Sequence, residues 1–338
     1  MLPVIDLHCD TLYKLAHAPE QFLSPQSTAV SHISYPGLCS AGSVLQCFAM
    51  FTDLCDTAYS SPLSCIREQY ACFRRILSLT EGRMVQIRTF PELAECMAQN
   101  KIAALLTLEE SCLSDTPVSL LPKLYALGVR IATLTWDYPT LLGTPANATP
   151  PSYAAGSSGL SSPLLRHYPA ETGLTPSGFD FLAEAERLGI LIDVSHLSDA
   201  GFRDVAAHSK QPFLASHSNA RAVCDVPRNL SDAMLRILGE HGGLVGLTLH
   251  EPFITSAPAA AEDLLAALVR HAKHILSVAG SDALALGTDF DGTSGNQAIP
   301  DITCLFRLED ALKKTGLTSS QTEKVLFRNA LRFFAANL

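Results

Sequence analysis

Residues 190–199 read Ile-Leu-Ile-Asp-Val-Ser-His-Leu-Ser-Asp, a short apolar run that passes through a histidine into a Ser-Asp pair. Runs rich in Ile, Leu and Val predict strands of a parallel sheet that is buried on both faces. Ser198 followed by Asp199 is typical of the start of a helix. The stretch therefore predicts one strand–helix unit with a polar side chain, His196, where the strand ends.

The same pattern recurs along the chain, where each apolar run is followed by a segment with helical spacing. The runs are residues 3–9, 44–51, 102–108, 129–135, 190–195, 212–216, 243–249 and 283–288. Eight such repeats predict an α/β fold of the TIM (β/α)8 barrel type. Barrels of this kind commonly reach this length as one unit, so residues 1–338 are expected to form a single domain.

Three other segments carry structural signals. Residues 84–90 predict an extra strand outside the main sheet, ahead of a helix that begins at Pro91. Residues 137–173 are dense in Pro, Ser, Gly and Thr, which predicts a long loop after the fourth strand. Ser320 and Glu323 have the spacing of a capping box at the start of the last helix.

Composition limits the partners and the compartment. Hydrophobic residues make up 47% of the chain and charged residues 17%, which suits a large core. A formal net charge of -9 argues against a nucleic acid or an anionic membrane as partner and favours a small molecule. The ten cysteines include no C-x-x-C pair and suggest reduced, core-filling thiols. With no signal-peptide pattern and no apolar run of membrane-spanning length, we expect a cytoplasmic protein, with a homodimer as the candidate assembly.

Residues of metal-ligand type stand at five of the eight predicted strand ends. They are His8 and Asp10 after the first strand, Glu109 after the third, His196 after the fifth, His217 after the sixth and Asp289 after the eighth. In a TIM barrel these ends meet on one face, where active sites are built. His8 and Asp10 are expected to point the same way, because alternate residues of an extended segment share a face, and Cys9 is expected to point away.

Imidazole nitrogens and carboxylate oxygens suit zinc, and these residues exceed the ligands of one open catalytic ion. The economical arrangement is two zinc ions that share Glu109 as a bridge. Such a pair polarises a carbonyl and holds a bridging hydroxide that attacks it, which predicts hydrolysis at a carbon centre. Each residue alone would more often be a core histidine or a capping aspartate, and only the shared face favours a metal site. The other histidines have no such placement, and His271 and His274 are expected on a solvated helix.

Seven motifs, taken in order along nearly the whole chain, resemble the membrane (renal) dipeptidase family. They are Asp6-Leu-His8-Cys-Asp10-Thr, Leu108-Glu109, Gly173-Leu-Thr-Pro-Ser-Gly178, Leu191-Ile-Asp-Val-Ser-His196, Ser216-His217-Ser218, Pro227-Arg228-Asn229 and Gly287-Thr-Asp289-Phe-Asp-Gly292. The resemblance implies a TIM barrel with two zinc ions that hydrolyses dipeptides. It implies that His8 and Asp10 bind one zinc, that His196 and His217 bind the other, and that Glu109 bridges them.

The resemblance also implies roles in substrate binding. Arg228 matches the residue that holds the substrate carboxylate, as a guanidinium does through two parallel hydrogen bonds. Asp289 matches the acidic residue near the substrate amine, and it would carry a proton to the leaving nitrogen, so Asp289 and Glu109 are the catalytic candidates. Asp291 is expected to be a turn residue.

The chain departs from the family after the fourth strand. The founding mammalian enzymes have a histidine there, thought to support the oxyanion, whereas this chain reads Thr133-Leu-Thr-Trp136-Asp137. Trp136 is the candidate for the same substrate-facing place, and its indole can donate a hydrogen bond but cannot carry charge. A further hypothesis is that the loop closes over the site and supplies a donor from His167 or Tyr168.

Two other functions are compatible with these residues. The first is another amidohydrolase reaction on the same barrel, such as lactam or N-acyl hydrolysis or deamination. The second is a metal-binding protein that has lost turnover together with the histidine.

Overall fold

The computed structural model describes residues 2–147, 162–169 and 172–338. Eight parallel strands form a closed barrel, as the sequence predicted. They are β1 (Val4–Asp6), β2 (Ser43–Phe51), β4 (Ile102–Glu109), β5 (Val129–Thr133), β6 (Leu191–Asp193), β7 (Leu214–Ala215), β8 (Leu244–Leu247) and β9 (Leu284–Leu286). Neighbours pair in this order, and β9 closes the ring by pairing with β1.

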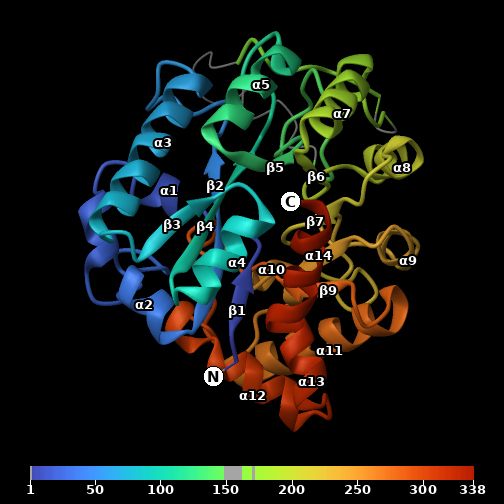
Figure 1. The fold of residues 1–338 in the computed structure, drawn as a ribbon. Coiled ribbons are helices and arrows are strands. Elements are labelled where there is room, and N and C mark those ends of the chain that lie inside the picture. The colour runs from blue at the N-terminus through green and yellow to red at the C-terminus, as the bar shows by residue number, and fades with distance from the viewer. Residues whose placement is uncertain (1, 148–161, 170–171) are drawn as a thin grey trace.

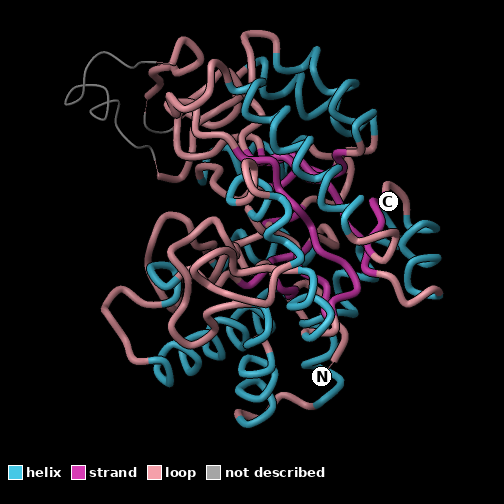
Figure 2. Tube along the Cα trace, turned by 90° about the vertical axis from the view of Figure 1, so that its left-hand side faces the viewer, coloured by secondary structure: helices cyan, strands magenta, loops and turns pink. Residues whose placement is uncertain are grey.

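Helices surround the strands, which run through the centre of the molecule in both views (Figure 1, Figure 2). The α-helices are α1 (Thr11–Lys14), α2 (Tyr35–Ser40), α3 (Pro62–Leu79), α4 (Phe90–Ala98), α5 (Pro117–Leu127), α7 (Pro176–Leu188), α8 (Asp199–His208), α9 (Asp232–Glu240), α10 (Glu251–Ile254), α11 (Ala261–Ala279), α12 (Phe306–Lys314), α13 (Ser319–Glu323) and α14 (Asn329–Asn337). Short 3-10 turns occupy η1 (Pro19–Leu23) and η2 (Ile302–Cys304), and η3 (Lys324–Arg328) is a π-helical turn.

The apolar residues of the strands divide into two layers because alternate side chains of a strand point to opposite faces. In β4, Ala103 and Leu105 belong to the layer inside the barrel, whereas Ala104 and Leu106 pack outward against the helices. Glu109 has the same parity as Leu105 and therefore faces the barrel interior at the strand's end. The terminal helix α14 closes the opposite end with the buried phenylalanines Phe333 and Phe334.

The extra strand is present and lies outside the closed ring. β3 (Met84–Ile87) pairs with the first half of β4 through Leu105, and β5 takes over the same edge from Leu106. The next helix, α4, begins at Phe90, one residue before the predicted start at Pro91.

Two local predictions are wrong. The capping box uses Thr318 and Gln321, because Thr318 Oγ1 accepts from the Gln321 N–H and Gln321 Oε1 accepts from the Thr318 N–H; the predicted Ser320 and Glu323 lie inside α13. His271 is fully buried, not solvated, because it stands on the inward face of α11 between Leu268 and Ile275. His274, on the same helix, is partly exposed and pairs with an aspartate of α9.

The segment predicted as a long loop is only partly described. Its described residues form no helix or strand, only single bridge pairs such as Gly143 with Leu174, and residues 148–161 and 170–171 lie outside the described part. Among the described residues, no helix is both long enough and apolar enough to cross a membrane.

Candidate active site

A cavity of about 310 Å³ opens where the barrel strands end. Its lining comes from the ends of all eight barrel strands and the loops that follow them, and it comprises Asp10, Tyr13, Phe51, Asp53, Glu109, Trp136, Asp137, Asn147, His196, Arg228, His250, Phe253, Asp289, Asp291, Gly292 and Thr293. His217, from the end of β7, lies directly behind His196, since their Nε2 atoms are 3.0 Å apart. The strand ends therefore converge as the barrel fold requires.

Glu109 lies between two groups of ligand-type side chains. Its Oε2 is 3.1 Å from His8 Nε2, and Asp10 Oδ2 is 3.3 Å from the same nitrogen. Its Oε1 is 3.0 Å from His196 Nε2 and 3.7 Å from His217 Nε2. Each oxygen of one carboxylate thus faces a different pair, and the ligand atoms of each group lie within 4.8 Å of one another.

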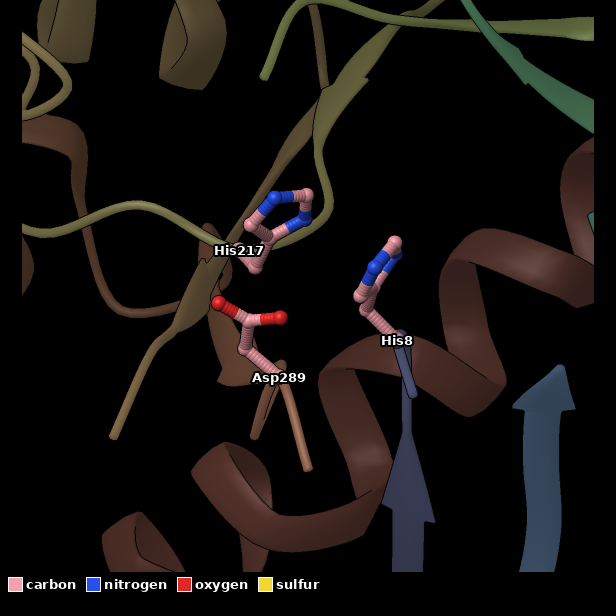
Figure 3. A group of neighbouring side chains, drawn as sticks. All are labelled: His8, His217 and Asp289. Carbon is pink, nitrogen blue, oxygen red and sulfur yellow. The ribbon is translucent and has the colours of Figure 1, made fainter. Parts of the chain in front are cut away.

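Asp289 belongs to a third group, with His8 and His217. Figure 3 shows these side chains pointing into one common space from three separate segments of the chain. His196 and Asp289 have φ angles of 67° and 62°, a left-handed backbone that costs a residue other than glycine roughly 1–3 kcal/mol. The fold holds this strain at two of the positions where the strand ends turn their side chains toward the cavity.

The hydrogen bonds behind the histidines define their tautomers. His196 Nδ1 lies 3.0 Å from a carboxylate oxygen of Asp137, which only accepts, so Nδ1 carries the proton. The Ser216 hydroxyl donates to Asp193 at 2.5 Å, and so it accepts from His217 Nδ1 at 2.8 Å and faces His8 Nδ1 at 3.5 Å. When each of the three rings is neutral, Nε2 is therefore the nitrogen with a free lone pair.

This donor set fits metal ions. Two imidazole lone pairs, on His196 and His217, meet at 3.0 Å beside a carboxylate oxygen, an arrangement that is repulsive without a cation between them. Among the described residues, the buried atom Asp10 Oδ1 has no hydrogen-bond partner, and His8 Nε2 faces two carboxylates without forming a well-aligned hydrogen bond to either. Unpaired buried polar atoms that point to one space are typical of a ligand site.

The pKa values show the same excess of charge. Burial, and then the charge of Glu109, raises the pKa of Asp10 to about 8. Burial lowers the pKa of His8, but Glu109 and Asp10 outweigh it and hold that pKa well above its usual range. Burial and the neighbouring His8 hold the pKa of His217 well below its usual range. Protons on these groups occupy places that a bound cation would take, because metal ligands must be deprotonated.

Arg228 is buried in the cavity wall with 3% of its surface exposed. Its guanidinium lies 5.2 Å from the Phe253 ring, and among the described residues its Nε has no partner. A buried guanidinium with an unused N–H beside an open cavity is suited to receive an anion, above all a carboxylate.

Trp136 also lines the cavity, partly buried between Phe51 and Tyr138, with ring centroids 4.9 and 5.6 Å away. Its backbone N–H donates to Glu110. Asp291 holds a turn together, as predicted, by accepting hydrogen bonds from Thr11, Ser31 and the His32 N–H.

Sequence reasoning missed some of the residues that line or support the cavity. His250 lines the cavity although it was placed among the histidines without a role; the available signal was its position directly after the predicted strand at 243–249. Asp137 and Asp193 support the histidines from behind. His167 is exposed and Tyr168 partly buried, and neither lines the cavity.

The comparisons with known proteins agree with this geometry. Residues 1–337 match the family model of membrane dipeptidase, peptidase family M19. An uncharacterised protein from the pqqA 5′ region of Klebsiella pneumoniae is 30% identical over 272 residues, 80% of this chain and 95% of that protein. Human Dipeptidase 3 is 32% identical over 243 residues, 70% of this chain and 45% of its own length, so this chain spans about half of that relative.

Solved structures agree over almost the whole chain. The crystal structure of dipeptidase AC, a metallo peptidase of family M19, has a TM-score of 0.84 at 26% identity and covers 99% of this chain and 98% of its own. A metallo peptidase from Rhodobacter sphaeroides, liganded with a phosphinate mimic of the dipeptide L-Ala-D-Ala, has a TM-score of 0.83 at 25% identity and covers 100% of this chain and 99% of its own.

Proposed function

Because this chain belongs to the membrane dipeptidase family, peptidase family M19, we propose that it is a zinc-dependent dipeptidase that holds two metal ions. The observation that carries the proposal is Glu109, whose two carboxylate oxygens face two separate groups of ligand atoms. A carboxylate in that position can serve both ions at once. Family membership and similarity to M19 structures make the chain a metallo-dipeptidase; the number and identity of the ions are our proposal.

His8 and Asp10 would hold one zinc, and His196 and His217 the other, with Glu109 shared. When bound, the ions would supply Lewis acidity for the scissile carbonyl and acidify water at neutral pH. The protein's own contribution is to fix the three imidazoles through Asp137 and Ser216, so that each presents Nε2.

The substrate would lie across the cavity with its carboxylate on Arg228. Because the guanidinium is fixed, it binds the substrate carboxylate at one distance from the reacting amide. This distance would select dipeptides over longer peptides. Asp289 is placed to take a proton from the attacking water and to deliver it to the leaving nitrogen, because its carboxylate lines the same cavity and groups with His8 and His217. Trp136 would form a wall of the substrate site with its indole N–H available to the substrate.

A panel of matched substrates tests this function. Native protein should contain zinc and hydrolyse dipeptides with a free α-amine and a free carboxylate. Amidated dipeptides should be poorer by about 10- to 150-fold in kcat/KM, because a hydrogen bond to a charged group contributes roughly 1.5–3 kcal/mol. Preferential turnover of N-acylated or lactam substrates would favour a different amidohydrolase reaction. Stoichiometric zinc with no turnover of any peptide would indicate a binding protein.

A further inference from the structure

The wall of the cavity opposite Arg228 is aromatic and acidic. Around the barrel, β2 and β7 are four strands apart in either direction and therefore lie on opposite sides of the mouth. Arg228 belongs to the loop after β7, whereas Phe51 and Asp53 end β2. Figure 1 shows β2 on the left of the strands and β7 on the right.

Tyr13, Phe51 and Trp136 form a continuous aromatic surface on the β2 side. The rings of Tyr13 and Phe51 meet edge to face at 5.3 Å, and those of Phe51 and Trp136 at 4.9 Å. The Tyr13 hydroxyl donates its hydrogen to Asp56, so its oxygen lone pairs remain available as acceptors. All three rings are partly exposed where they line the cavity.

Asp53 stands at the edge of this aromatic surface. Its Oδ1 accepts the Cys55 N–H at 2.8 Å, which fixes the loop, and among the described residues no lysine, arginine or histidine forms an ion pair with it. After burial, the charge of Asp53 is the next cause that raises the pKa of Tyr138, which also forms a hydrogen bond with the Asp53 carboxylate and whose ring packs behind Trp136. The carboxylate therefore lies beside the aromatic surface and faces the cavity.

The other cavity carboxylates already have partners. Asp10 and Glu109 face His8, Asp137 binds His196, and Asp291 is held in its turn. Asp289 is assigned to the reacting end of the substrate. Among the described residues, Asp53 has only neutral hydrogen-bond partners, and a carboxylate beside aromatic rings is a combination that recognises organic cations through ion pairing and cation–π contact.

We propose that Tyr13, Phe51, Trp136 and Asp53 form a subsite for a cationic side chain, so that the preferred substrates are dipeptides with Lys or Arg as the N-terminal residue. This inference rests on the proposed function, which sets the C-terminal carboxylate on Arg228 and so directs the N-terminal residue to the β2 side. The buried Arg228 Nε, which has no partner in the part of the chain that the structure describes, independently indicates that the cavity receives an anionic ligand end.

Three dipeptides that share a C-terminal alanine test the subsite: Lys-Ala, norleucine-Ala and Glu-Ala. The shared end keeps the contribution of Arg228 constant. Native enzyme should favour Lys-Ala over norleucine-Ala by about 10-fold in kcat/KM, less at high salt, and should disfavour Glu-Ala. In Asp53→Asn, the ratio of kcat/KM for Lys-Ala to kcat/KM for norleucine-Ala should fall toward one. Asp53→Lys should reverse the order of Lys-Ala and Glu-Ala, a result that misfolding does not produce.

Asp180→Asn is the matched control, since it removes one exposed carboxylate on α7 far from the cavity and should leave the ratio unchanged. Equal kcat/KM for Lys-Ala and norleucine-Ala in the native enzyme would overturn the subsite and leave the dipeptidase function intact. Loss of all three activities in both Asp53 variants would indicate that Asp53 is needed for folding, and it would also overturn the proposed subsite. No turnover of any dipeptide by zinc-loaded native protein would remove the proposed function, and the subsite with it.

Discussion

At the scale of single residues, Glu109 gives the sharpest test of the metal centre. Glu109→Gln replaces one carboxylate oxygen with an amide NH2, which cannot bind a cation, and so it should remove activity and weaken both zinc sites together. Metal content by mass spectrometry or atomic absorption, measured alongside turnover, checks this. Full occupancy of either site in the variant would contradict the shared role.

The control for Glu109→Gln should be a surface residue such as Glu184, not the neighbouring Glu110. Glu110 is fully buried, and its carboxylate accepts the N–H groups of Cys112 and Trp136. A glutamine at position 110 would turn its NH2 group toward one of these N–H groups, and that buried N–H would lose its acceptor. Glu184 forms only an exposed pair with Arg187, so its substitution should change neither zinc content nor activity.

Ser216 gives a second residue-scale prediction because its oxygen accepts from His217 Nδ1 and faces His8 Nδ1. Ser216→Ala removes the acceptor that orients rings of both proposed sites. Zinc affinity should fall by roughly 10- to 100-fold, as is typical when a group behind a ligand is lost. Competition with a fluorescent chelator measures it. Ser218→Ala is the matched control, since that hydroxyl has no partner among the described residues, and an equal loss of affinity there would rule out a specific role for Ser216.

Residue type at a strand end is what made the candidate ligands predictable. His8, Glu109 and His196 interrupt apolar runs at the places where a barrel gathers its active site, and the structure brings them together. Asp193 could not be found this way, because its role depends on a contact with Ser216 on the neighbouring strand's end, and no spacing within the sequence reports that contact.

At the scale of elements, apolar periodicity predicted the strands but not which helix faces are buried. All eight barrel strands occur where the runs are, since a strand buried on both faces has few polar residues. His271 was misjudged because a histidine is usually solvated; here Nδ1 accepts the Ala220 N–H and Nε2 donates to the Ile254 carbonyl, so its burial is satisfied. Burial lowers the pKa of His271 to about 4, so the ring stays neutral.

The terminal helix α14 gives an element-scale prediction. Phe333 is fully buried and packs with the apolar layer inside the barrel, at the end opposite the cavity. Phe333→Ala should lower the free energy of unfolding by about 3–5 kcal/mol through lost burial and the cavity left behind. Urea unfolding measures the change, with the exposed neighbour Arg332→Ala as control. A loss below about 1 kcal/mol would show that α14 does not contribute to the barrel core.

At the scale of the whole molecule, the barrel gathers more buried charge at one end than its own side chains can balance. In the metal-free protein, protons balance part of it: Asp10 has a pKa of about 8, Asp289 of about 6, and His8 one well above its usual range. Each of these groups is protonated more readily in the folded than in the unfolded chain. Each therefore stabilises the metal-free fold at low pH, and that stabilisation is lost as pH rises through the folded-state pKa.

Zinc binding should reverse this dependence, because the ions displace the protons and binding becomes tighter as pH rises. The midpoint of thermal unfolding should therefore be higher for zinc-loaded than for chelator-treated protein, and this difference should widen from about pH 6 to pH 8. Comparing the two forms at each pH removes the contribution of His271 and of other titratable groups away from the cavity, because these groups affect the stability of both forms equally. Scanning calorimetry across that range checks the prediction. A difference that stays constant or shrinks as pH rises would mean that His8 and Asp10 do not exchange protons for metal, and the site would have to be assigned to other groups.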